Sequence, residues 1–269
     1  MTGTTVEGIS TSRLAPPWRL AGGAVSILSL LVGVVLWEVV GRVWQVSFIP
    51  PVSEVLATLV ELVESGEILG NLAASLVNLG VGFAISVVGG VVIGALMGVF
   101  PIVNSALDTY VYALLTAPSL VFAPIFFSIF GLGRGSIIAL VVMYAMFIII
   151  INTADGVRSV PQELVDMSRS FNATRLQTLV RVVLPAATPM IMAGLRLGVS
   201  RAVKGMINGE MFIAVVGLGR VVTQAGGRFD AAAVLAVLIV IIAVAWLASA
   251  LVRLVDNRLT GWLPTVNRS

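Results

Sequence analysis

The chain has 269 residues, of which 58% are hydrophobic and 11% are charged, and its formal net charge is +3 at pH 7. Soluble domains are about 45–50% apolar and about 25% charged, so this composition suits a lipid bilayer better than water. The sequence contains no cysteine and no histidine, which excludes disulfides, thiolate or imidazole metal sites and catalytic pairs built on either residue. We therefore expect no catalytic residue, no metal site and no cofactor held by this chain.

Six apolar segments predict six membrane-spanning helices, because each is near the roughly 20 residues that cross a bilayer and isolated strands stay unpaired in lipid. They cover residues 22–41, 73–100, 110–131, 136–152, 189–215 and 231–252. The first is interpreted as an uncleaved anchor, since its apolar run is longer than a signal-peptide core and no A-x-A site follows it. The expected fold is an all-α polytopic membrane protein with a cytoplasmic loop between the fourth and fifth spans.

The placement of arginine predicts the orientation of these spans, because cytoplasmic loops carry the excess of basic residues. With the N-terminus in the cytoplasm, nine arginines lie inside, namely Arg13, Arg19, Arg158, Arg169, Arg175, Arg181, Arg253, Arg258 and Arg268. Four lie outside, namely Arg42, Arg134, Arg220 and Arg228. Residues 1–20 and 259–269 are then cytoplasmic tails, and residues 21–258 form the transmembrane domain, with the long loop at about 154–186. We expect a multi-pass protein of the bacterial inner membrane with both termini in the cytoplasm.

The connection between the first two spans, residues 48–71, is predicted to be an interfacial amphipathic helix that serves as a lid or as a lateral brace. Pro50 and Pro51 bend the chain there, and Ser53 is expected to cap the helix. Glu38, in the first span, is expected to lie near the outer interface as an anchor.

The second span has a small residue at every fourth position. These residues are Gly82, Ser86, Gly90, Gly94 and Gly98. This spacing lets helix backbones approach closely in lipid. It predicts internal packing in preference to a sliding interface.

The loop before the fifth span is polar and predicts two short helices. Pro161 suits a helix start, because its missing N–H would be unpaired there, and residues 162–170 form the first helix. Asn172 tolerates the left-handed conformation that ends it, and Thr174 can cap a second helix over residues 175–183. Two short helices with a sharp turn make a compact knob, which can transmit a rigid-body push.

This loop resembles the EAA loop of binding-protein-dependent ABC importer permeases, whose pattern is EAA-x3-G followed by I-x-LP. Asp166, Met167 and Ser168 stand where Glu-Ala-Ala is usual. Asn172 stands where glycine is usual, and the Leu-Pro pair is kept at positions 184 and 185, where we expect it to redirect the chain into the fifth span. Aspartate keeps the charge of glutamate, and asparagine keeps the tolerance of left-handed geometry.

The resemblance implies that the knob is the coupling helix that docks into an ATPase. The residues that it assigns to this contact are Asp166, Met167, Ser168, Phe171, Asn172, Ala173, Thr174 and Arg175. Further matches are similar to the nitrate, sulfonate and taurine-type subgroup. They are FIPPVSEV at 48–55, IFGLGRGS at 129–136, GLRLGVSRA at 194–202, GEM at 209–211 and GLG at 217–219.

The resemblance also implies partners. These are a cytoplasmic ABC ATPase dimer, an extracytoplasmic solute-binding protein and a second permease subunit, identical in preference to a different chain. Residue Lys204 follows Val203 instead of a glycine, so the sequence has no phosphate loop and ATP would be bound by the partner. We expect contact with membrane lipid and none with nucleic acid.

Charged residues inside the fifth span are functional candidates, because a charge at the membrane centre costs roughly 2.5–3.5 kcal/mol on insertion scales. Arg201 and Lys204 are three residues apart and share a helix face. They either border a path for anions or hold helices together. Glu210 is six residues from Lys204 and points away from it in a continuous helix, so either Gly205 and Gly209 break the helix or Glu210 pairs with another helix.

The function implied is the permease subunit of an ATP-driven importer, which forms the path for a small anionic solute and carries out no chemistry. Sulfonate, taurine and nitrate fit the subgroup, while an aromatic carboxylate and a pyrimidine-like vitamin precursor stay open. The alternative is a self-contained secondary transporter or channel, which usually shows internal repeats and needs no polar knob. An intramembrane enzyme is disfavoured, since the sequence has no G-x-S-x-G elbow.

Overall fold

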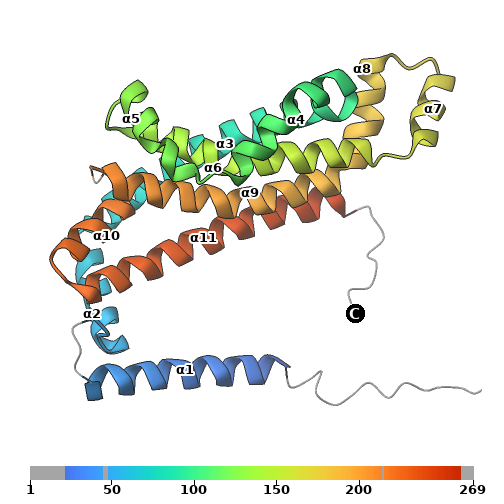
Figure 1. Ribbon diagram of the computed structural model, residues 1–269. Helices are drawn as coiled ribbons and strands as arrows, with labels where there is room; N and C mark the ends of the chain where they lie inside the picture. The colour runs from blue at the N-terminus through green and yellow to red at the C-terminus, as the bar shows by residue number, and fades with distance from the viewer. Residues whose placement is uncertain (1–21, 45–47, 214, 262–269) are drawn as a thin grey trace, which may run out of the picture.

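The computed structural model describes residues 22–44, 48–213 and 215–261, with only the backbone described for 22–24. All regular elements in these ranges are helices (Figure 1). In chain order they are α1 Gly22–Trp44, α2 Val52–Glu64, α3 Glu67–Val99, α4 Pro101–Thr116, η2 Ser119–Phe122, α5 Ala123–Phe130, α6 Arg134–Arg158, α7 Gln162–Ser170, α8 Arg175–Thr178, η3 Leu179–Val183, α9 Leu184–Ile213, α10 Leu218–Gly227 and α11 Ala231–Thr260. The all-α prediction is confirmed. Three arginines of the orientation argument, at positions 13, 19 and 268, lie outside the described residues, as does the predicted tail 1–20.

The predicted six spans appear as five long apolar helices and one bent pair. The bent pair is the third span, which was predicted as one continuous helix over residues 110–131, and that prediction is wrong. It begins earlier, at Pro101, and it bends by 99° between α4 and the segment Ser119–Phe130. Proline disfavours helical geometry at the residue before it. Ala117, which precedes Pro118, accordingly takes the extended angles φ −61° and ψ 141°.

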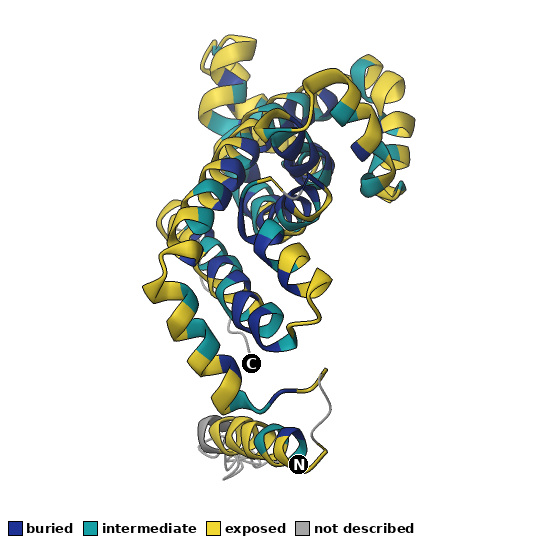
Figure 2. Ribbon diagram, turned by 90° about the vertical axis from the view of Figure 1, so that its left-hand side faces the viewer, coloured by how far each residue is buried: buried dark blue, intermediate teal, exposed yellow. Residues whose placement is uncertain are grey.

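Helix α6 is the centre of the bundle and packs along both α3 and α9 (Figure 1). The buried residues gather in the middle of the helices (Figure 2). The small residues of α3 face α6. A Cβ added at Gly82 would lie 2.6 Å from Val141, and one at Gly90 would lie 2.7 Å from Ile149. The prediction that these positions serve internal packing is confirmed. Helix α9 packs against α6 in the same way, where a Cβ at Gly194 would lie 2.7 Å from Asn152.

Helix α2 is amphipathic and packs sideways against α11, as the lateral-brace interpretation expected. The predicted cap at Ser53 is wrong, because the helix already begins at Val52 and its N-cap residue, Pro51, makes no side-chain cap hydrogen bond. The carboxylate of Glu38 in α1 takes that role. It accepts hydrogen bonds from the Ser53 backbone N–H at 3.0 Å and from the Ser53 hydroxyl at 2.9 Å. Arg42 Nε donates to the same carboxylate at 2.6 Å. Glu38 therefore fixes the corner between α1 and α2.

The predicted turn at Leu184-Pro185 is absent, because helix α9 continues directly from η3 and α8. One helical run extends from Arg175 to Ile213. Proline at position 185 lacks an N–H and its ring would clash with the carbonyl four residues earlier. The preceding turn avoids this conflict by widening to a π-helix over Leu179–Val183, in which the Leu184 N–H donates to the Leu179 carbonyl. A single widened turn thus absorbs the proline without ending the helix.

Candidate functional site

The knob, residues 162–183, projects from one end of the bundle, the same end at which α1 begins and α11 ends (Figure 1). Its first helix has the bounds that the sequence predicted, Gln162–Ser170. Asn172 follows with φ 56°, in the left-handed region. Thr174 then caps α8 in a reciprocal capping box with Gln177, in which Thr174 N–H donates to Gln177 Oε1 at 2.9 Å and Gln177 N–H to Thr174 Oγ1 at 3.3 Å. The turn is therefore held by local hydrogen bonds.

A buried contact pins the two helices of the knob to each other. The hydroxyl groups of Ser168 and Thr178 lie 2.9 Å apart and share a hydrogen bond. Ser168 is only 6% exposed, so a partner protein cannot reach it in this arrangement. Ser168 was among the residues predicted to contact the partner, but its side chain instead holds the two helices of the knob together. The base of the knob packs into the bundle through Val183 and Ala187, beside Val157 of α6.

The knob exposes large apolar side chains in a segment that is otherwise polar. Phe171 is 80% exposed, Leu176 is 69% exposed and Met167 is 52% exposed. Asp166, Asn172, Thr174 and Arg175 are also exposed, while Ala173 is half-buried. Large apolar side chains exposed on a short polar segment are candidates for contact with a partner protein. Leu176 was not among the predicted contact residues, although an isolated leucine within a run of polar residues could have indicated an exposed apolar contact.

Helix α9 has a polar face that its own chain leaves uncovered. Ser200 and Lys204 are exposed and Arg201 is half-buried, whereas their neighbours Ala202 and Val203 are buried. The predicted common face of Arg201 and Lys204 is present. Across 22–44, 48–213 and 215–261, neither cation takes part in an ion pair. This face therefore presents positive charge with no carboxylate to neutralise it.

Glu210 lies apart from these cations, fully buried between α9, α3 and the start of α10. Helix α9 is unbroken at Gly205 and Gly209, so the alternative in which Glu210 pairs with another helix describes the geometry. Its carboxylate accepts from Ser75 Oγ at 2.7 Å and from Asn78 Nδ2 at 3.1 Å. It also accepts from the Gly219 backbone N–H at 3.1 Å, at the N-terminus of α10. A carboxylate is stabilised there by the helix dipole.

The turn between α9 and α10 closes over this carboxylate. Gly217 has φ +91°, a conformation that other residues rarely adopt, and a side chain there would collide with the Glu210 carboxyl group. The Gly217 N–H donates to Asn71 Oδ1 at 3.1 Å, and the Leu218 N–H donates to Ser75 Oγ at 2.9 Å. The Glu210 cluster, defined as Glu210 with Asn71, Ser75, Asn78 and the turn 217–219, thus joins α3, α9 and α10. Its members on α3 are 132 to 146 residues away from their partners in the sequence, so no local pattern could have found them.

A second polar contact anchors α9 nearer to the knob. Arg196 forms an ion pair with Asp256 of α11, and Asp256 also accepts a hydrogen bond from Thr260 Oγ1 at 3.2 Å. Helix α9 is therefore attached by charged groups at two levels, to α11 by Arg196 and to α3 and α10 by Glu210.

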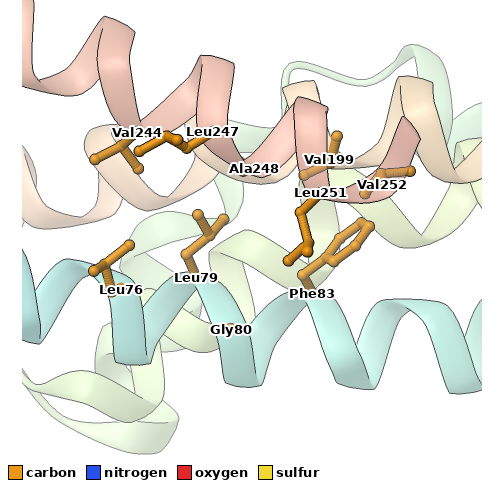
Figure 3. Close-up of a pocket in the computed structure, with 10 residues that line it drawn as sticks. All are labelled: Leu76, Leu79, Gly80, Phe83, Val199, Val244, Leu247, Ala248, Leu251 and Val252. Atoms are coloured by element: carbon orange, nitrogen blue, oxygen red, sulfur yellow. The ribbon is translucent and has the colours of Figure 1, made fainter. Parts of the chain in front are cut away.

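An apolar pocket of about 290 Å³ lies between α3, α9 and α11 (Figure 3). The residues that line it carry no polar side chain: Leu76, Leu79, Gly80, Phe83, Val199, Val244, Leu247, Ala248, Leu251 and Val252. It therefore offers no polar or charged side chain to orient a polar solute. The polar face of α9 is the better candidate for contact with a solute.

Five long apolar helices and one bent apolar pair, with a knob at one end and unneutralised charge on one helix face, define a polytopic membrane transport protein. Residues 90–261 match the family of binding-protein-dependent transport system inner membrane components. The chain belongs to this family, and it is a permease component of such a system. The predicted resemblance is thus confirmed.

Relatives match the chain over most of its length. It is 31% identical to the putative aliphatic sulfonates transport permease protein SsuC of Bacillus subtilis, over 93% of this chain and 91% of that protein. It is 31% identical to the taurine transport system permease protein TauC of Escherichia coli, over 95% and 96%. It is also 31% identical to the nitrate import permease protein NrtB of Leptolyngbya laminosa, over 70% and 67%.

A solved structure shares the fold. A chain of the MetNI methionine ABC transporter, in an inward-facing conformation, matches with a TM-score of 0.59 and 21% identity, over 70% of this chain and 92% of that chain.

Proposed function

We propose that this chain forms the translocation path for a small anionic solute of the sulfonate, taurine or nitrate class in an ATP-driven importer. Two copies of the chain would surround the path, a solute-binding protein would deliver the solute from outside, and an ABC ATPase dimer would bind at the knob and hydrolyse ATP. The names of three relatives support this class of solute, since they refer to transport of aliphatic sulfonates, taurine and nitrate.

The observation that carries the proposal is the continuity between the knob and α9. The knob presents Phe171, Leu176 and Met167 to a partner, and α8 passes without a break into α9. A push on the knob would therefore move the helix that bears Arg201 and Lys204. Packed helices respond to such a push by rigid-body displacement, because their interiors do not deform continuously.

The position of the knob also bears on the orientation of the chain in the membrane. The knob, the start of α1 and the end of α11 lie toward the same end of the molecule (Figure 1). If the knob binds a cytoplasmic ATPase, both termini lie in the cytoplasm, in agreement with the arginine distribution. The turn 217–219 and helix α2 would then face outward, toward the binding protein.

The charge of α9 supports an anion as the solute. Buried or membrane-embedded cations are paired with carboxylates or line a polar cavity, because hydrocarbon does not solvate them. Lys204 is exposed, and no described carboxylate pairs with it. A path beside α9 would solvate Lys204 and attract anions at the same time.

The test is whether the apolar surface of the knob holds an ATPase. Phe171→Glu and Leu176→Glu add charge to exposed positions, so insertion and melting temperature should stay unchanged, while ATPase co-purification and ATP-dependent uptake should fall at least tenfold. Leu132→Glu, at an equally exposed apolar position in the turn between α5 and α6, is the matched control and should retain both. Normal co-purification and uptake with both knob variants would refute the proposal.

A further inference from the structure

The Lys204 face of α9 carries more polar groups than its two cations. Asn208 lies one turn beyond Lys204, and its Nδ2 donates a 2.8 Å hydrogen bond to the Tyr144 hydroxyl of α6. Both side chains are half-buried. Ser200 lies one turn before Lys204 and is exposed. Residues four apart on a helix are neighbours on its surface, so a hydroxyl, an ammonium and an amide follow one another along the face.

The position of Tyr144 beside this row depends on a glycine. A Cβ added at Gly205 would lie 3.0 Å from both Cβ and Cγ of Tyr144. The tyrosine ring therefore rests against the α9 backbone next to Lys204 and reaches along the helix to Asn208. Because its oxygen accepts from Asn208, the Tyr144 hydroxyl keeps its own proton to donate.

We propose that Lys204, Asn208 and Tyr144 form an oxyanion-binding station on the translocation path, with Ser200 at its rim. Its ligand is an exposed sulfonate, nitrate or carboxylate group. Lys204 supplies the charge and charge-assisted hydrogen bonds, and Asn208 and Tyr144 supply neutral donors that orient the oxygens. Tyr144 and Asn208 are thereby specificity-determining residues. The station rests on the proposed function in one respect, namely that the solute passes beside α9.

The chemistry of the row favours this ligand over lipid. Lys204 projects from a helix long and apolar enough to span a membrane, and acyl chains offer no acceptor for its ammonium donors. The lipid-compatible surfaces of the chain look different: around Val88 of α3, the exposed side chains Val81, Ile85 and Val92 are all apolar. Val88 thus provides a reference position that is exposed but faces hydrocarbon.

The absence of cysteine from the chain gives a direct test. A single cysteine in place of Ser200 can be modified with the anionic reagent 2-sulfonatoethyl methanethiosulfonate or the cationic 2-(trimethylammonio)ethyl analogue. The anionic reagent carries the sulfonate on a two-carbon chain, so it is also a probe of the ligand class. Val88→Cys is the matched control and should react with neither reagent. Modification is measured on the purified complex in proteoliposomes, without ATP.

We expect Ser200→Cys to react faster with the sulfonate reagent than with the ammonium reagent, each rate taken relative to a free thiol. Adding Lys204→Met should lower this ratio about tenfold, the effect of one charge-assisted hydrogen bond, and Lys204→Arg should preserve it. Adding Tyr144→Phe or Asn208→Leu should lower the sulfonate rate about threefold or more and leave the ammonium rate unchanged. A purely structural role for Tyr144 would instead change both rates together.

Two results would overturn the station. One is a Ser200→Cys thiol that is as unreactive as Val88→Cys, which would place this face outside water. The other is a rate ratio that Lys204→Met leaves unchanged. Since the thiol chemistry needs neither ATP nor a binding protein, it is independent of import. A charge-selective Ser200→Cys in a complex that fails to import with ATP would count against the proposed function and leave the station intact.

Discussion

The Glu210 cluster makes a quantitative prediction about the stability of the end of the bundle opposite the knob. Glu210→Ala removes the acceptor from three donors, namely Ser75 Oγ, Asn78 Nδ2 and the Gly219 N–H. Hydrogen bonds between membrane helices contribute about 0.6 kcal/mol on average and up to about 1.7 kcal/mol. Three of them therefore amount to about 2–5 kcal/mol. Glu210→Gln keeps one acceptor oxygen and turns the other into a donor, so its loss should be smaller.

The assay is the melting temperature of the detergent-purified subunit, followed by the fraction that stays monodisperse after heating. For a protein of this size, 1 kcal/mol corresponds to roughly 2–4 °C, so Glu210→Ala should melt at least about 4 °C lower. Gly217→Ala should also destabilise, because its Cβ would collide with the Glu210 carboxyl group at a positive φ. Gly226→Ala is the matched control, since nothing lies within 4 Å of the added Cβ.

Two outcomes would contradict this role of Glu210: a Glu210→Ala variant with the melting temperature of the wild type, or equal melting temperatures for Gly217→Ala and Gly226→Ala. Either outcome would mean that the turn 217–219 is not held by the buried carboxylate. A lower melting temperature for Glu210→Ala, with Gly226→Ala unchanged, would localise the loss to this cluster.

Three further predictions concern the contact between α3 and α6, the knob, and the orientation of the chain in the membrane. Gly90→Ala should lower the stability of the bundle by about 1–3 kcal/mol through overpacking, because its Cβ would lie 2.7 Å from Ile149. Gly80→Ala should be neutral, because nothing lies within 4 Å of its Cβ, and equal melting temperatures for the two variants would contradict the packing argument. Asn172→Val should destabilise the turn at φ 56° by about 1–2 kcal/mol and reduce uptake, while Asn172→Gly should be tolerated; wild-type uptake by the valine variant would count against a rigid knob. Reporter fusions at Glu64 and Arg175 should lie on opposite sides of the membrane, and signals from one side would overturn the topology.

The knob was predictable because its determinants are local. The bounds of α7, the left-handed Asn172 and the cap at Thr174 each depend on residues within a few positions of one another. Such short-range signals survive in a single sequence.

Two of the errors have a common cause, which is that a neighbouring element met a requirement that the local pattern seemed to impose on the residue itself. Ser53 has the chemistry of a cap, yet Glu38 of α1 satisfies the start of α2 instead. Pro185 has the chemistry of a helix break, yet the π-helical turn before it accommodates the ring. The third span was the opposite case, because the hydropathy of residues 110–131 concealed the break that Pro118 imposes. Apolar composition predicts residence in the membrane and says little about helix continuity there.

The polar residues of α9 divide into those that fix the helix and those that its own chain leaves unpaired, and this division links the structure to transport. Arg196 forms an ion pair with α11, and Glu210 is buried and accepts hydrogen bonds from α3 and α10. Arg201 and Lys204 lie between them in the sequence, where Arg201 is half-buried and Lys204 is exposed. A helix attached at two levels and driven from the knob would carry the cations of its free face past a solute as a unit. The two attachments would then limit how far that face can move, because a larger displacement would have to break the Arg196–Asp256 pair or uncover the Glu210 carboxylate.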